Sequence, residues 1–118
     1  MVFETIRSSA SATAILSISG NLDLSTISRF RSEVVQAIDE SGPSIILDLL
    51  GVDIFETVSL GVIFEAVKRS GTRDGFVVLV NQSEWLAKDL QLTGANQILT
   101  VTSTVSEAIE FLQSASHR

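Results

Sequence analysis

The apolar residues of this chain change their spacing several times, and each spacing predicts a different element. Val2–Arg7 and Thr13–Ser19 have alternating or β-rich patterns around a turn rich in serine and alanine, which predicts an antiparallel hairpin. After a Gly-Asn pair at 20–21 breaks the second strand, Ser25 is the predicted N-cap of an amphipathic helix. Gly42-Pro43 is expected to end this helix, because proline cannot continue the intrahelical hydrogen bonds.

The second half of the chain alternates continuous apolar runs with amphipathic stretches. Ile45–Leu49 and Phe76–Val80 are nearly unbroken apolar runs, as expected for strands that are buried on both faces. Helices are expected over about Thr57–Arg69 and over Glu84–Leu92. Ile98–Val101 is expected to form a short edge strand, and a last amphipathic helix follows it.

Two of these helices have further signals at their ends. Ser83 is the predicted N-cap of the helix at 84–92, and Gly94 follows that helix at a position where left-handed backbone is favoured. Thr104 and Glu107 have the spacing of a capping box at the start of the last helix. The helix boundaries are therefore expected close to these residues.

The order of the elements predicts the fold class. A hairpin followed by alternating helices and strands requires crossover connections between parallel strands. We therefore expect an α/β protein with a mixed, mostly parallel sheet of about four or five strands, flanked by about four helices. The 118 residues are expected to form a single domain, 1–118.

Composition excludes several classes of protein. Apolar residues make up 45% of the chain, yet the longest apolar run, at 76–80, is far too short to span a membrane. No secretion signal is visible, and the absence of cysteine excludes disulfides and thiol chemistry, so a cytoplasmic protein is expected. The net charge of −6 argues against binding to nucleic acid.

The sequence contains no recognisable catalytic or cofactor-binding constellation. There is no cysteine or tyrosine, the single histidine lies next to the C-terminus, and no glycine-rich phosphate loop is present. Asp23, Asp48, Asp53 and Glu56 are expected to serve turns and strand ends rather than to bind a metal ion. We therefore expect neither enzyme activity nor a cofactor.

The most informative segment runs from residue 47 to residue 62. It leads from an apolar strand, through a short acidic loop, into a helix whose expected first residue is Thr57. At such a position backbone N–H groups are unpaired and the helix dipole is positive, so a phosphate on the threonine hydroxyl would be stabilised. The alternative is that Thr57 is only a helix N-cap.

Several fragments of the chain resemble one family in order and spacing. They are Gly20-Asn21-Leu22-Asp23, Leu47-Asp48-Leu49 with Gly51-Val52, Phe55 through Val62, Val80-Asn81, Leu92-Thr93-Gly94, and Val101 through Ala108. Together they resemble the STAS domain of anti-sigma factor antagonists over nearly the whole chain. The fragment Phe55 through Val62 is similar to the family signature Phe-x-Asp-Ser-Ser-Gly-Leu-Gly-Val.

This signature is altered in the present chain. When Leu60-Gly61-Val62 is taken as the anchor, the serine that the family phosphorylates falls on Thr57. The preceding aspartate falls on Glu56, the second serine on Val58 and the next glycine on Ser59. Ser59 is a rival acceptor, and its added bulk is expected to hinder a partner kinase.

The resemblance implies partner switching in transcription regulation. The unphosphorylated protein would bind an anti-sigma factor, an ATP-binding serine/threonine kinase that phosphorylates Thr57, and a phosphatase would reverse the modification. It also implies a set of partner-binding residues, Asn21, Asp23, Ser25, Glu56, Ser59 and Leu60, supported by Asp48 and Gly61. A phosphate beside Glu56 and near Asp23 would weaken the complex through charge repulsion and desolvation.

Other functions are open at this stage. In one alternative, a STAS interaction module binds a kinase or a transport ATPase constitutively, and the replacement of the signature by Val58 and Ser59 favours this alternative. A phosphoacceptor enzyme like a response-regulator receiver is disfavoured, because no acidic pair follows the first strand and Leu99–Thr104 contains no lysine. A small-ligand pocket, the partner's identity and self-association are left open by the sequence.

Overall fold

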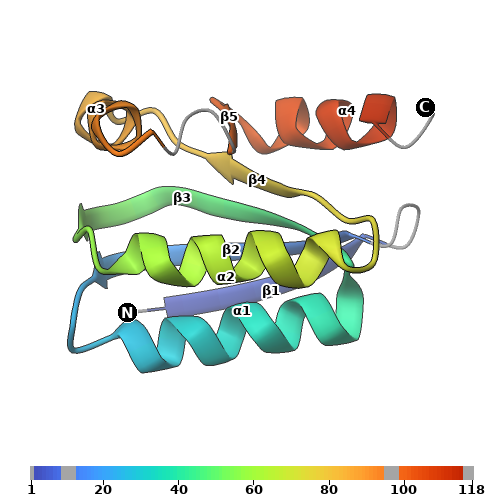
Figure 1. Cartoon of the computed structure of the whole chain (residues 1–118), viewed down its shortest axis with the longest axis horizontal. Helices are drawn as coiled ribbons and strands as arrows, with labels where there is room; N and C mark the ends of the chain where they lie inside the picture. The colour runs from blue at the N-terminus through green and yellow to red at the C-terminus, as the bar shows by residue number, and fades with distance from the viewer. Residues whose placement is uncertain (1, 9–12, 95–98, 116–118) are drawn as a thin grey trace.

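The computed structural model describes residues 2–8, 13–94 and 99–115. This part of the chain forms five strands and four helices (Figure 1). In order they are β1 (Val2–Ser8), β2 (Thr13–Leu22), α1 (Ile27–Ser41), β3 (Ser44–Phe55), α2 (Ser59–Gly71), β4 (Val77–Val80), α3 (Glu84–Leu92), β5 (Thr100–Thr102) and α4 (Val105–Ala115). None of these helices is long and apolar enough to cross a membrane.

The strands form one sheet in the order β1-β2-β3-β4-β5. β1 pairs with β2 in antiparallel orientation, and all other neighbours are parallel. The predicted α/β class, the mixed and mostly parallel sheet, the N-terminal hairpin and the edge position of the last strand are thus confirmed. The expected turn of the hairpin, at 9–12, lies outside the described residues.

Helices cover both faces of this sheet. Phe30 of α1 and Ile63 of α2 pack with Leu47 of β3 in the larger core cluster. Ile46 faces the opposite way and packs with Leu112 of α4 in a second cluster. Because successive side chains of a strand point to opposite faces, a central strand between two helical layers must be apolar at nearly every position. The continuous runs seen in the sequence are therefore explained.

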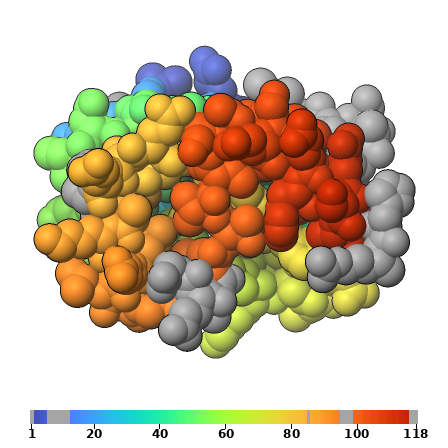
Figure 2. Space-filling view, turned by 90° about the horizontal axis from the view of Figure 1, so that it is seen from above, coloured from blue at the N-terminus to red at the C-terminus, as the bar shows by residue number. Residues whose placement is uncertain are grey.

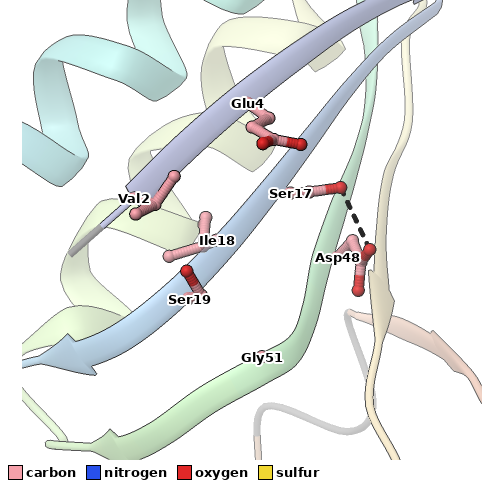
Figure 3. A pocket seen from close by; sticks show the side chains of 7 residues that line it. All are labelled: Val2, Glu4, Ser17, Ile18, Ser19, Asp48 and Gly51. Carbon is pink, nitrogen blue, oxygen red and sulfur yellow. Dashed lines mark hydrogen bonds between the residues drawn. The ribbon is translucent and has the colours of Figure 1, made fainter.

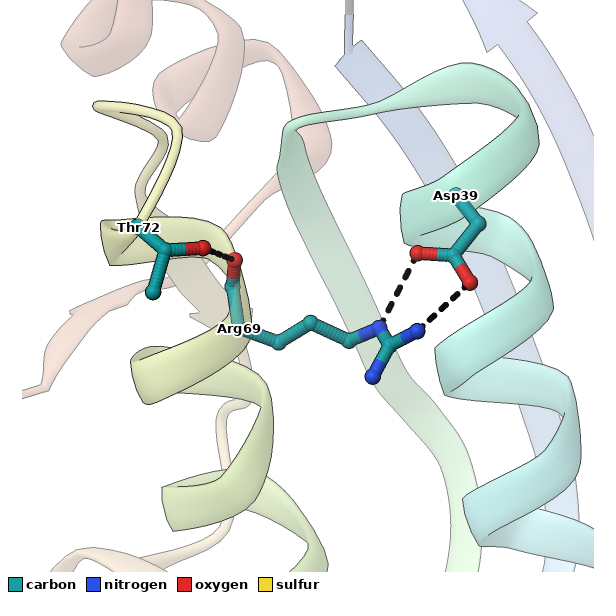
Figure 4. Close-up of polar contacts among 3 residues, drawn as sticks. All are labelled: Asp39, Arg69 and Thr72. Atoms are coloured by element: carbon teal, nitrogen blue, oxygen red, sulfur yellow. Dashed lines mark hydrogen bonds and ion pairs between the residues drawn. The ribbon is translucent and has the colours of Figure 1, made fainter.

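Two exposed ion pairs join α1 to α2. Arg69 donates two hydrogen bonds to Asp39, from Nε to Oδ1 at 2.9 Å and from Nη2 to Oδ2 at 2.7 Å (Figure 4). Arg31 Nε donates to Glu65 Oε2 at 3.0 Å. Exposed pairs of this kind contribute at most about 1 kcal/mol each, so their main effect is to set how the two helices lie against each other.

Two strands are longer than the sequence indicated. β2 continues through Gly20 and Asn21 to Leu22, and β3 continues to Phe55. Parallel pairing of Leu22 with Phe55, past two irregularities in register, buries both side chains and holds the extensions together. The expected loop after residue 49 is therefore wrong, since these residues form strand.

The ends of the helices mostly agree with the sequence signals. α3 has the predicted bounds, with Ser83 as N-cap and with Gly94 at φ +76°. The predicted capping box is confirmed, because the Glu107 N–H donates to Thr104 Oγ1 at 3.1 Å, while Glu107 Oε1 accepts from the Ser103 N–H at 2.9 Å.

Two other expected boundaries need correction. The N-cap of α1 is Thr26, not Ser25, because Ser25 is used in the preceding turn. β5 begins at Thr100, and the expected strand start at Ile98 lies outside the described residues.

Candidate functional site

The connection from β3 to α2 lies at the carboxyl end of the central strand. The Glu56 N–H donates to Leu22 O at 2.8 Å, so the start of the connection is fixed to the end of β2. Thr57 and Val58 form a turn before α2 begins at Ser59. The helix thus starts two residues later than expected.

This turn has the hydrogen bonding of a 3₁₀ helix. The N–H groups of Ser59, Leu60 and Gly61 donate to the carbonyls three residues earlier, at 2.9, 3.0 and 3.3 Å. The N-cap of α2 is Val58, so the alternative in which the Thr57 side chain is the cap is wrong. The reason is that backbone carbonyls of the tight turn already satisfy the first N–H groups of the helix.

Thr57 is an exposed residue at the positive end of α2. Within the described part of the chain, its hydroxyl has no hydrogen bond. The hydroxyl oxygen is therefore accessible to another protein. The N–H groups of Thr57 and Val58, the first of the turn, are positioned at the same end of the helix as this hydroxyl.

Ser59 and Leu60, the first two residues of α2, do not match their expected role in partner binding. Ser59 is 0% exposed and Leu60 is 3% exposed, because the start of α2 turns both side chains toward the core. The bulk of Ser59 therefore does not hinder a kinase, and its hydroxyl is not an accessible rival acceptor. Among the described residues, no partner satisfies this hydroxyl.

Gly61 lies at the surface of the first turn of α2. A Cβ built at this position would have no atom within 4 Å, and the backbone does not have a positive φ. Nothing inside the described protein therefore requires glycine here. Glycine in a helix interior costs about 0.5–1 kcal/mol of stability relative to alanine. Because Gly61 has no side chain, the surface beside Thr57 is flat at this position.

The loop from β2 to α1 lies next to this turn, because Leu22 and Phe55 are paired at the ends of their strands. Asp23 Oδ1 accepts from the Ser25 hydroxyl at 2.6 Å and from the Ser25 N–H at 2.9 Å. Thr26 Oγ1 accepts from the Asp23 N–H at 3.0 Å and donates to Asn21 O at 2.9 Å. These bonds give the loop a defined shape, with Asn21 and Ser25 exposed.

The hydrogen bonds to Asp23 lower the pKa of its carboxyl group, chiefly through the Ser25 hydroxyl and then through the backbone N–H groups of Ser25 and Thr26. A carboxyl group with a lowered pKa in the folded state favours folding above its unfolded pKa, and that contribution is lost as the pH falls. This loop should therefore loosen in acid.

Removing the Ser25 hydroxyl is expected to raise the pKa of Asp23 toward its ordinary value of 3.8. The Ser25→Ala variant tests this through an NMR titration of the side-chain carboxyl carbons. Asp39 is an internal control, because its lowered pKa depends on Arg69 and should be the same in both proteins. An unchanged Asp23 titration would show that the hydroxyl does not bind the carboxylate in solution.

Asp48 does not lie at the turn formed by Thr57 and Val58. It accepts a hydrogen bond from the Ser17 hydroxyl at 3.0 Å and from the Leu50 N–H at 3.1 Å (Figure 3). The seven residue steps of strand from Asp48 to Phe55 span roughly 23 Å. The expected direct support of the switch is therefore corrected: Asp48 joins β2 to β3, the strand that leads to the turn.

Two exposed apolar side chains near the turn were missed in the sequence. Leu24 is 75% exposed in the β2–α1 loop, and Val58 is 45% exposed beside Thr57. Each is an apolar residue in a short polar segment between two elements. This pattern was the sequence signal that could have identified them as exposed contact residues. Among the described residues there is no group of three or more His, Cys, Asp or Glu side chains that could hold a metal ion.

Comparison with known proteins identifies similar chains. The model of the STAS domain family matches residues 5–108. A candidate anti-sigma factor antagonist from Thermotoga neapolitana is 35% identical over 69 residues, which are 58% of this chain and 61% of that relative. The matched segment thus spans less than two thirds of the relative's length.

Solved structures give a similar result. The crystal structure of a candidate anti-sigma factor antagonist from Thermotoga maritima superposes with a TM-score of 0.85, at 27% identity and with 94% of each chain covered. The anti-sigma factor antagonist SpoIIAA in its unphosphorylated form has a TM-score of 0.73 at 18% identity, covering 95% of this chain and 98% of that chain. At this identity, SpoIIAA shows the shared fold alone.

Proposed function

The chain belongs to the STAS domain family, and from this premise we propose that it is an anti-sigma factor antagonist controlled by phosphorylation of Thr57. It binds an anti-sigma factor kinase and so releases the sigma factor that this kinase holds. The kinase transfers the γ-phosphoryl group of its ATP to the Thr57 hydroxyl, whose proton is lost, and ADP leaves. A phosphatase reverses the modification. Because ATP is the donor, the exchange takes place in the cytoplasm.

The observation that carries this proposal is the exposed hydroxyl of Thr57 at the start of α2. A threonine in this position can enter the active site of a kinase without unfolding of the helix. Once formed, the phosphate lies at the positive end of the helix dipole, close to the first N–H groups of the turn. The role proposed for the chain is binding, and the catalysis belongs to its partners.

The surface around Thr57 suits a partner that responds to charge. Leu24 and Val58 offer exposed apolar contact, while Asp23 and Glu56 add negative charge beside it. A phosphate contributes about −1.5 to −2 further charges at neutral pH. A partner that buries this surface must then desolvate the phosphate next to two carboxylates, and the complex is weakened.

Gly61→Ala tests whether a partner approaches the first turn of α2 closely. We expect the substitution to raise the free energy of unfolding by up to about 1 kcal/mol, because alanine favours helix and has room here. We expect the same methyl group to weaken the kinase complex severalfold, because it stands between the two proteins. Denaturation by urea and titration calorimetry measure the two effects. Tighter or equal binding by the more stable variant would place the interface elsewhere.

Phosphorylation itself is tested with purified anti-sigma factor kinases and ATP, followed by mass spectrometry of the digested chain. The expected result is a single phosphate on Thr57, with none on the buried Ser59. Thr57→Val, which keeps the shape of the side chain and removes the hydroxyl, should not be modified. Modification of wild type at another residue, or none with any kinase that binds the chain, would end the switch proposal.

The second candidate is a module that binds its partner constitutively. The observation that favours it is the altered signature at Val58 and Ser59. It predicts a stable complex with a kinase or a transport ATPase that no substitution at Thr57 regulates. A complex that forms equally well with Thr57→Glu would select this candidate.

A further inference from the structure

The outer face of the sheet, opposite α1 and α2, is only partly covered by helices. α4 packs there through Leu112 against Ile46 of β3 and Val78 of β4. In the described part of the chain this cluster also includes Ile15 near the start of β2, but no residue of β1, of the second half of β2 or of the second half of β3. In the space-filling view from above, atoms of α3 and α4 fill most of the side turned to the viewer, and blue and green atoms of the first half of the chain show at its margin (Figure 2).

The strand register shows which side chains occupy the uncovered part. Val2 pairs with Ser19, and Glu4 pairs with Ser17, so each pair shares one face. The alternate pair, Phe3 with Ile18, faces α1, where Phe3 stacks on Phe30. Val2, Glu4, Ser17 and Ser19 therefore lie on the outer face, as the close-up shows (Figure 3).

β3 adds two apolar side chains to the same face. Leu49 is buried in the cluster beneath α1 and α2, and Leu50 after it is 48% exposed at the register shift between the Asp48 and Gly51 pairs. Phe55 is also in that cluster, and Ile54 before it is 52% exposed. With Val2, which is 53% exposed, they form an apolar strip on β1 and β3 that is interrupted by Ser19 of β2.

The polar side chains of this face have one sign of charge. Glu4 and Asp48 flank a shallow hollow of about 220 Å³, and Gly51 is also among the residues that line it. The described residues of the outer face include no lysine or arginine. An apolar strip beside two carboxylates is complementary to a surface that is apolar on one side and basic along its border.

The size of the uncovered area fits one helix. Neighbouring strands lie about 4.8 Å apart, so two strands and the edge of a third span about 10 Å, the diameter of a helix with its side chains. α4 already covers the adjacent strands in this manner. A second helix beside α4 would complete the outer layer.

We infer that the outer face formed by Val2, Glu4, Ser19, Asp48, Leu50 and Ile54 binds an amphipathic helix of a partner protein. The apolar side of that helix covers Val2, Leu50 and Ile54, and lysine or arginine residues along its border face Glu4 and Asp48. Ile54 lies three residues before Thr57, so the surface adjoins the turn at Thr57 but does not include it. Binding to the surface does not require the phosphate.

The test uses the full chain labelled with ¹⁵N and a synthetic 18-residue peptide of leucine and lysine at helical spacing. NMR titration should show amide shifts along the exposed ends of β1, β2 and β3, with the turn at Thr57 unaffected. A second peptide with glutamate in place of lysine should bind at least about tenfold more weakly, because the face is acidic.

Variants of two exposed leucines separate specific docking from general attraction. Leu50→Ser should weaken binding of the lysine peptide about tenfold, and Glu4→Lys should weaken it severalfold. Leu92→Ser is the matched control, because Leu92 is 76% exposed on α3, outside this face. The affinity of this variant for the lysine peptide should be unchanged. Ile54→Ser replaces Leu50→Ser if the core amide signals of the latter show unfolding.

Three results would overturn the inference. They are the absence of shifts on the outer face with the lysine peptide, shifts of the amides around Thr57 in their place, and equal effects of Leu50→Ser and Leu92→Ser. Each result would show that the peptide responds to the net charge of −6 or to another surface. None of them bears on phosphorylation at Thr57, so the proposed function is tested independently.

Discussion

Replacing Thr57 with glutamate is expected to weaken the complex with the anti-sigma factor kinase by about 5–150-fold, or roughly 1–3 kcal/mol. The carboxylate adds negative charge beside Glu56, on an exposed turn that a partner must desolvate. Because one carboxylate has less charge than a phosphate, the effect should lie in the lower half of this range. Titration calorimetry with the purified kinase and a non-hydrolysable nucleotide measures it.

Thr57→Val is the matched control for this substitution. It keeps the branched shape of threonine and adds no charge, so its complex should have nearly the affinity of wild type while phosphorylation is lost. Equal weakening by valine and glutamate would mean that the hydroxyl is a contact rather than a switch. Both variants should unfold at nearly the wild-type urea concentration, because Thr57 is exposed and does not cap α2.

Phe30→Ala is expected to have the largest effect on stability, about 3–5 kcal/mol. Phe30 is 0% exposed in the larger core cluster, and its ring stacks on Phe3 of β1 with centroids 6.5 Å apart. The loss combines the transfer of the buried ring with the cavity left behind. Since small domains are stable by about 5–15 kcal/mol, this loss is a large fraction of the total stability. Urea denaturation followed by circular dichroism gives the difference.

Phe76→Ala provides the comparison for this core substitution. Phe76 is 43% exposed and contacts Phe111 edge to face, with centroids 6.2 Å apart. Less apolar surface is removed from water and no closed cavity forms, so its cost should be clearly smaller than that of Phe30→Ala. Equal costs at the two positions would mean that α1 does not seal the core in solution.

The parts of the fold that local sequence determines were predictable. The continuous runs at Ile45–Leu49 and Phe76–Val80 identified the central strands, because a strand between two helical layers is apolar on both sides. The N-cap Ser83 and the capping box of Thr104 and Glu107 placed two helices, since these signals lie within a few residues of sequence. The mostly parallel sheet followed from the need for crossover connections.

The features that depend on distant pairing were not predictable. Gly20 and Asn21 have the composition of a turn, yet they are strand because the end of β3 lies beside them. The burial of Ser59 depends on a 3₁₀ turn that rotates the first residues of α2, and a resemblance to a sequence signature has no information about that rotation. Thr57 is exposed beside the start of α2, as expected, whereas the alternative in which it caps the helix is wrong.

The attachment of the turn at Thr57 has a consequence for regulation. β3 is hydrogen-bonded to β2 along most of its length and to β4 in its first half, and Glu56 continues the pairing up to the turn itself. Under the proposed function, phosphate would be added to a rigid support, and hydrogen exchange in the core strands should be the same before and after modification. The two forms would then differ in charge at the exposed turn and not in backbone conformation, so a partner would distinguish them by the phosphate itself.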